Sequence, residues 1–153
     1  MTSELAFQIA HELIEEAKVD LESARTHLRE GRYHKTIFES QQCVEKLMKA
    51  ALACEGLTQI YEHDVSGLFA SEVVSRAEQT EAEDLREVFR RTMWLFEHYA
   101  LSRYPIVRGK KIRVPRKEYD RDDGLQAIQE AEYALKIIEQ YLQRKYPLLG
   151  KDE

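Results

Sequence analysis

Four stretches of this 153-residue chain repeat apolar side chains at steps of three and four residues, the period of an α-helix. The first stripe consists of Ala10, Leu13, Ala17, Leu21, Ala24 and Leu28. The second consists of Ile37, Gln41, Val44, Leu47, Met48, Ala51 and Leu52, the third of Leu85, Val88, Phe89, Leu95, Phe96 and Tyr99, and the fourth of Leu125, Ile128, Ala131, Leu135, Ile138 and Leu142. We place the second helix at about residues 33–54 and the third at about residues 81–100. Each stripe must be buried against another element, so the pattern predicts helices packed on helices.

Residues at the ends of these stretches predict where the helices begin and end. Gly31 and Gly56 follow the first two stripes, and glycine readily takes the left-handed conformation that ends a helix. Asp120, with Asp123 three residues later, is typical of a helix N-terminus, and the last helix ends before Pro147. The link between the first two helices is short, which makes them antiparallel neighbours.

These boundaries predict an all-α fold, an antiparallel up-down bundle of four long helices. A short extra helix, capped by Asp64 or Ser66, is expected between the second and third long helices. No stretch is convincing as a β-strand. The length suits a single domain, residues 1–153, with a core over about residues 5–146 and a frayed tail at 147–153.

The composition excludes several classes of protein. The longest apolar run, residues 47–54, is interrupted by Lys49 and is too short to cross a bilayer. The N-terminus lacks the basic start of a secretory signal. Cys43 and Cys54 lie about three helical turns apart, too far for a disulfide, so we expect reduced thiols and a cytoplasmic location. The five histidines show no zinc-ligand spacing with cysteine, so we expect neither metal nor cofactor.

Positive charge is concentrated in one segment. Residues 103–117, RYPIVRGKKIRVPRK, carry seven cations and no acid, although the net charge of the chain is −5. The rest of the chain is therefore strongly acidic, and this asymmetry can direct an anion to one place. Pro105, Gly109 and Pro115 argue against a continuous helix here, so we expect a loop, which we call the basic segment.

The second predicted helix, GRYHKTIFESQQCVEKLMKAAL, resembles the second helix of the HEPN family. The later HYALSRYP, followed by Pro115, Tyr119 and Asp122, is similar to the exit from the third helix and the entry to the fourth in the same family. The ordered similarity covers roughly residues 10–145. The resemblance implies a small helical protein that is usually a homodimer and often pairs with a small nucleotidyltransferase, as in toxin–antitoxin systems. Members are linked to nucleotide binding or to RNA cleavage.

Many RNA-cleaving members of the family have an Arg and a His separated by four to six residues near the end of the third helix. Arg91 and His98, separated by TMWLFE, fit this spacing and lie two turns apart on nearly one face. Histidine suits proton transfer near neutral pH, and arginine suits a phosphate. The alternative is a chance pair on a charged helix, since Thr92 departs from the family's pattern. The family branch with Arg-Tyr-Pro, found here at residues 103–105, often lacks the His.

Arg103 and Tyr104 are stronger candidates for ligand contact. An Arg beside an aromatic ring and further cations can hold a phosphate and stack a base. The full set of candidate nucleotide- or RNA-binding residues is Arg103, Tyr104, Arg108, Lys110, Lys111, Arg113, Lys46 and Lys49. Two of them have simpler structural alternatives: Tyr104 as a ring packed over the end of the bundle, and Lys49 as a surface partner of Glu45.

Three functions stay open at this stage. The first is a dimeric module that binds nucleotides or RNA and works with a small nucleotidyltransferase. The second is a metal-independent endoribonuclease toxin that uses the Arg91 and His98 pair. The third is a scaffold whose basic segment docks an acidic protein surface without contacting nucleic acid.

The basic segment offers little apolar surface to bury, so we predict that it is mobile without a ligand. Its backbone amides should exchange with solvent much faster than those of the four long helices, as measured by hydrogen–deuterium exchange. Protection equal to that of the helices would contradict this prediction.

Overall fold

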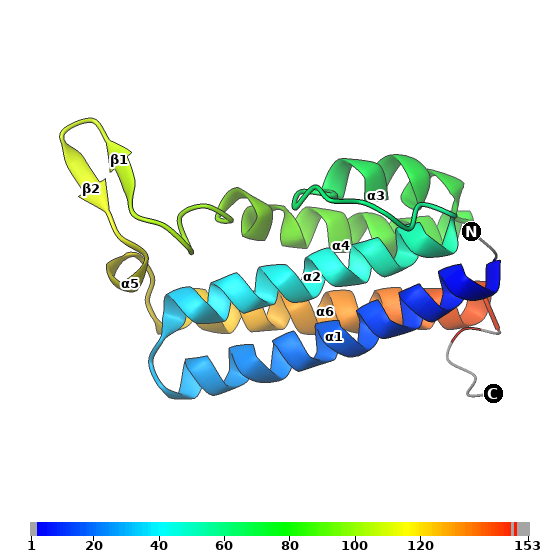
Figure 1. Ribbon diagram of the computed structural model, residues 1–153, viewed down its shortest axis with the longest axis horizontal. Helices are drawn as coiled ribbons and strands as arrows, with labels where there is room; N and C mark the ends of the chain where they lie inside the picture. The colour runs from blue at the N-terminus through cyan, green and yellow to red at the C-terminus, as the bar shows by residue number, and fades with distance from the viewer. Residues whose placement is uncertain (1–2, 148, 150–153) are drawn as a thin grey trace.

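The computed structural model describes residues 3–147 and residue 149. Its elements are α1 (Ser3–Arg29), α2 (Tyr33–Cys54), α3 (Ser66–Glu72), the 3-10 helix η1 (Val74–Arg76), α4 (Gln79–Glu97), β1 (Ile106–Arg108), β2 (Lys111–Arg113), α5 (Pro115–Glu118) and α6 (Arg121–Lys145). The long helices α1, α2, α4 and α6 form an antiparallel bundle, with α3 packed beside it (Figure 1). The predicted fold class is therefore confirmed. Most of the tail expected to fray, 147–153, lies outside the described residues.

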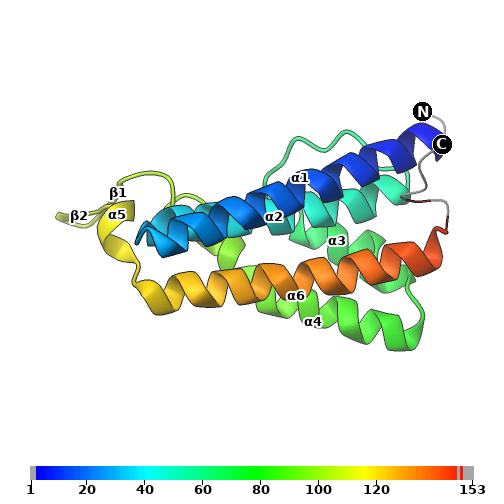
Figure 2. The same cartoon turned by 90° about the horizontal axis from the view of Figure 1, so that it is seen from below.

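Helix α2 is the centre of the bundle, because it packs against α1, α3, α4 and α6. Figure 2 shows α1 and α2 along one side of the molecule and α6 and α4 along the other. The side chains of Ile37, Leu47, Met48 and Leu52 are fully buried, and each contributes about 1.5–3 kcal/mol relative to an exposed side chain. Gln41 is buried among them, as its place in the apolar stripe predicted.

Glycines end both of the first two long helices, as the sequence predicted. Gly31 has φ 75° and Gly56 has φ 93°. Beyond Gly56, the amide of Leu57 donates to the carbonyl of Leu52 at 2.9 Å, which closes the last turn of α2. The chain then leaves the helix in a new direction while the carbonyl of Leu52 keeps a hydrogen-bond donor.

Aspartates make hydrogen bonds at the starts of α6 and α3. Asp120 accepts a hydrogen bond from the amide of Asp123, and the Asp123 carboxylate accepts one from the amide of Asp120, which forms a reciprocal cap on α6. At α3, the Asp64 carboxylate accepts from the amide of Ser66 at 3.1 Å and from its hydroxyl at 2.6 Å. The cap on α6 confirms the sequence prediction. At α3 the N-cap position is Val65 rather than Asp64 or Ser66, although Asp64 hydrogen-bonds the first residue of the helix.

The expectation that the chain contains no strand is wrong. Part of the basic segment forms a β-hairpin in which β1 and β2 pair antiparallel, with Val107 opposite Ile112 and Arg108 opposite Lys111. Gly109 has φ 62° and no other residue type has positive φ among the described residues, a pattern that fits a type II′ turn. This turn twists in the same sense as paired strands, which explains why so short a hairpin forms. The hairpin projects beyond one end of the bundle (Figure 1).

Cys43 and Cys54 are free thiols. Burial raises the pKa of each to about 12, so neither forms a reactive thiolate near neutral pH. Within residues 3–147, the structure contains no helix that is both long and apolar enough to span a membrane.

Two glycine substitutions separate backbone conformation from packing. A methyl group added at Gly56 or at Gly67, which lies inside α3, would have no heavy atom within 4 Å. Gly56→Ala should lower the free energy of unfolding by about 1–2 kcal/mol, because alanine resists positive φ. Gly67→Ala should raise it by about 0.5–1 kcal/mol, because alanine favours the helix. Urea denaturation of both variants measures the difference, and shifts of equal sign would contradict the assignment of Gly56 as a helix stop.

Candidate functional site

A groove of about 570 Å³ lies between the start of α2 and the chain that leaves α4 and enters α5. We call it the Arg103 groove. Its lining residues are His34, Lys35, Phe38, Gln42, Tyr99, Ser102, Arg103, Tyr104, Pro105, Val114, Pro115 and Arg116. Three of them are permanent cations and none is a carboxylate. The groove is therefore a positively charged place on an acidic protein.

Arg103 is held firmly although it is only half-buried. Its guanidinium lies 3.7 Å from the centre of the Tyr99 ring and 3.9 Å from that of Phe38. Nη1 donates to the Tyr99 carbonyl at 3.0 Å, and Nη2 donates to Oε1 of Gln41 at 2.9 Å. No carboxylate forms an ion pair with Arg103 in the described part of the chain. Burial lowers the pKa of Arg103, although the group stays charged at any physiological pH.

A polar chain inside the bundle fixes the orientation of Gln41. Its Nε2 donates to Oε1 of Glu45 at 3.0 Å, so its carbonyl oxygen must face the other way, toward Arg103. Lys49 donates to the second oxygen of Glu45 at 3.0 Å. His63 stacks on Tyr99, with ring centres 4.7 Å apart, and its Nδ1 is 3.5 Å from Glu45. Glu45 therefore supports Arg103 through an amide and does not neutralise it directly.

The two lysines proposed from α2 do not line the Arg103 groove. Lys49 pairs with Glu45, which matches the structural alternative for that residue. Lys46 reaches toward α1 and contacts the carboxylate of Asp20 at 2.7 Å. The structure therefore gives both lysines intramolecular partners.

The hairpin presents further cations next to the groove. Arg108, Lys110 and Lys111 are exposed, and none of them forms an ion pair with another described residue. Arg113 pairs with Glu118 of α5. Cross-strand pairing places Arg108 and Lys111 on one face of the hairpin and the exposed Val107 and Ile112 on the other.

Arg91 faces α6 rather than the groove. Its Nη2 donates to Glu130 at 3.1 Å, its Nε also contacts that carboxylate, and its guanidinium lies 3.8 Å from the centre of the Tyr133 ring. The hydrogen bond to Glu130 is the main cause of a raised pKa at Arg91. The Arg91 guanidinium therefore already forms an ion pair with the buried carboxylate of Glu130.

His98, the other half of the proposed catalytic pair, lies at the end of α4. Its Nδ1 is 2.8 Å from the hydroxyl of Tyr119, and the Trp94 ring contacts it edge-on. Burial raises the pKa of Tyr119 to about 12, so this hydroxyl stays protonated. In the described structure no hydrogen bond joins His98 to Arg91. Arg91 and His98 therefore contact different residues, and neither lines the Arg103 groove.

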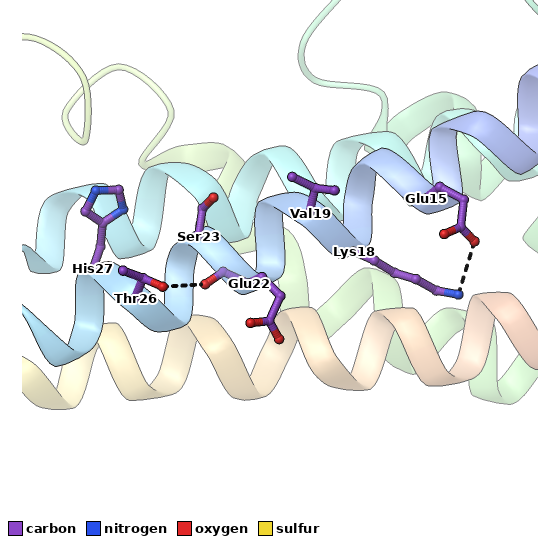
Figure 3. Close-up of a pocket in the computed structure, with 7 residues that line it drawn as sticks. All are labelled: Glu15, Lys18, Val19, Glu22, Ser23, Thr26 and His27. Carbon is purple, nitrogen blue, oxygen red and sulfur yellow. Dashed lines mark hydrogen bonds and ion pairs between the residues drawn. The ribbon is translucent and has the colours of Figure 1, made fainter.

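A second groove, of about 430 Å³, runs along the outside of α1 (Figure 3). Its lining residues are Glu15, Lys18, Val19, Glu22, Ser23, Thr26 and His27. They come from one helix, and the charged members are paired: Lys18 contacts Glu15 and Glu139, and His27 contacts Glu39 at 3.0 Å. Acids balance the cations here, so this groove does not attract anions as the Arg103 groove does.

Several residues of the groove were not among the candidates predicted from the sequence, namely His34, Lys35, Phe38 and Arg116. One signal was present in the sequence: the first turn of α2 contains His34 and Lys35 but no acid. Acidic side chains stabilise a helix N-terminus, so their absence beside two basic groups is unusual.

Comparison with known proteins agrees with this architecture. The model of the HEPN domain family matches residues 10–142, so the chain belongs to the HEPN domain family. It is 33% identical over 136 residues to "Putative toxin MJ1304" of Methanocaldococcus jannaschii, covering 88% of this chain and 89% of the relative.

Two solved structures have the same fold. ST0689, an archaeal HEPN homologue, superposes with a TM-score of 0.64 at 26% identity, covering 87% of this chain and 97% of its own. TT1696 from Thermus thermophilus also gives a TM-score of 0.64, at 24% identity over 86% and 96% of the two chains.

Replacing Arg103 with lysine should destabilise the fold although the charge is kept. Lysine cannot lie flat between two rings while bonding both Gln41 and the Tyr99 carbonyl. We expect Arg103→Lys to lower the free energy of unfolding by about 1–2 kcal/mol in urea denaturation. The matched control, Arg108→Lys on the exposed hairpin, should change it by less than about 0.5 kcal/mol. Equal stability of the two variants would show that the contacts of Arg103 contribute nothing.

Proposed function

We propose that this HEPN protein binds the phosphate groups of a nucleotide or an RNA in the Arg103 groove. The observation that carries the proposal is the charge of the groove: Lys35, Arg103 and Arg116 line it, and no carboxylate does. The lining of the groove therefore offers these cations no negative charge of its own. A phosphate supplies the missing negative charge and accepts several hydrogen bonds at once.

The side chain of Arg103 is prepared for this task. Stacking on Phe38 and Tyr99 fixes the plane of its guanidinium, so little conformational entropy is lost when an anion binds. Two of its nitrogens each make one hydrogen bond within the protein, to Tyr99 and Gln41, which leaves other N–H groups for a ligand. The geometry therefore supports hydrogen bonds from Arg103 to an anion at a fixed position, rather than a general electrostatic attraction without fixed contacts.

The surroundings of the groove suit a nucleic-acid strand. Tyr104 lies at the edge of the groove and is 62% exposed, so its ring is available to stack on a base. Arg108, Lys110 and Lys111 on the hairpin extend the positive surface beyond the groove, where further phosphates of a strand would lie.

The biological setting that we propose is a toxin–antitoxin pair. The relative from Methanocaldococcus jannaschii has "toxin" in its name, and the family resemblance links such proteins to homodimers and to a small nucleotidyltransferase partner. Light scattering would give the mass of the assembly, and co-expression with a nucleotidyltransferase encoded beside the gene would test the partner. The alternative scaffold function predicts a stable protein complex without any RNA binding.

Binding of a labelled single-stranded RNA tests the proposal. We expect the affinity to fall about tenfold or more between 50 and 200 mM salt, since three phosphate contacts release several counterions. The double variant Lys35→Gln/Arg116→Gln should bind weakly and with a smaller salt dependence. Both positions are exposed, so the fold should be unaffected.

The matched control is Arg86→Gln/Lys136→Gln. It removes the same charge from exposed positions that form no ion pair with another described residue, on the parts of α4 and α6 distant from the groove. It should bind like the unmodified protein. Equal losses in the two double variants would mean that only net charge matters, and the groove would not be the site.

The same mixtures, incubated with a chelator and separated on a gel, test the endoribonuclease hypothesis. Cleavage that His98→Ala abolishes would make Arg91 and His98 the working pair. Intact RNA in every lane would leave phosphate binding as the function of the chain.

A further inference from the structure

The charge of the Arg103 groove exceeds what one internal phosphate of RNA requires. An internal phosphodiester carries one negative charge, whereas a terminal phosphomonoester carries between about 1.5 and 2 at neutral pH. Lys35, Arg103 and Arg116 give the groove three permanent positive charges with no acid among the lining residues. Resting on the proposed function, we propose that the groove recognises a terminal phosphomonoester, on a free nucleotide or on an RNA end, in preference to an internal phosphodiester.

The start of α2 adds to the positive potential of the groove. Its first turn holds no acidic residue, and His34 and Lys35 lie there beside the helix N-terminus. The permanent charge of Lys35 is repelled by the positive end of the helix dipole, and a dianion in the groove offsets this repulsion. One internal phosphodiester compensates only part of it.

The environment of His34 disfavours its protonated form. Burial is the main cause of its lowered pKa, and Lys35, His27 and Arg32 lower it further. Arg103 and Arg116 face the same groove from the α4 exit and from α5. The charged side chains that line the groove with His34 are all cations, so a doubly charged phosphate there would favour protonation of the imidazole more than a singly charged one.

The walls of the groove set the orientation of the ligand. The guanidinium of Arg103 already covers one face of Phe38 and one face of Tyr99, and His63 stacks on Tyr99 as well. Tyr104 is exposed at the edge and available. The phosphate thus lies among the cations while the attached base stacks outside them. This arrangement fits the end of a chain, where only one side of the phosphate continues into a nucleoside.

The test compares two RNA hexamers of one sequence, one with a 5′-phosphate and one with a 5′-hydroxyl. We expect the phosphorylated hexamer to bind at least tenfold more tightly at pH 7.5. This ratio should fall below about threefold in Lys35→Gln/Arg116→Gln and stay unchanged in the control Arg86→Gln/Lys136→Gln. Tyr104→Ala should weaken both hexamers equally and leave the ratio intact.

Competition with adenosine monophosphate and with adenosine distinguishes the two sources of the phosphate. Displacement by the monophosphate but not by adenosine supports a free nucleotide as a sufficient ligand. No displacement, together with the tenfold preference, supports an RNA end. Equal affinity of the two hexamers, with both weakened by Lys35→Gln/Arg116→Gln, would overturn the inference and leave the proposed phosphate binding intact. If neither hexamer binds and adenosine monophosphate does not bind when tested directly, both proposals are wrong.

Discussion

The buried amide of Gln41 connects the helical core to the candidate site. Glu45 holds its nitrogen, and this leaves its oxygen for the guanidinium of Arg103. Because an unpaired polar group in the core is costly, the amide constrains both neighbours: the carboxylate must stay close and the arginine must turn inward. The path of the chain after α4 follows from this constraint. Arg103 is anchored on α2, so the next residues start from the rim of the groove and the hairpin begins beyond it.

The charge of the protein is organised around the same point. Most cations elsewhere in the described structure have acidic partners, as Lys46 has Asp20 and Arg91 has Glu130. The groove is different because its cations are close together and its walls are aromatic or neutral. Repulsion among them is tolerated since Lys35 and Arg116 are exposed to water, where charges are strongly screened. The arrangement costs the folded state little and leaves the groove ready for an anion.

The helical architecture was predictable from the sequence, and the reason is physical. Apolar period, glycine stops and aspartate caps all act within a few residues, and the bounds of α2 agree with the predicted 33–54. The hairpin was missed because a three-residue strand shows no useful alternation, and its turn depends on one glycine. The groove was found only in part. Arg103 and Tyr104 were recognised from the sequence. Lys35 and Arg116 lie 68 and 13 residues from Arg103 in the sequence, and only tertiary packing brings them to the same groove.

The attachment of the hairpin has an evolutionary consequence. Among the described residues its two strands pair only with each other, and the side chains of Val107 and Ile112 are 71% and 68% exposed. Insertions, deletions or exchanged sequences between the flanking prolines therefore leave the packing of α1, α2, α4 and α6 untouched. A lineage can vary this appendage to engage new macromolecules while the anion pocket at its base stays constant. The helical bundle can therefore stay the same while the hairpin changes, because substitutions in the hairpin affect the stability of the fold least.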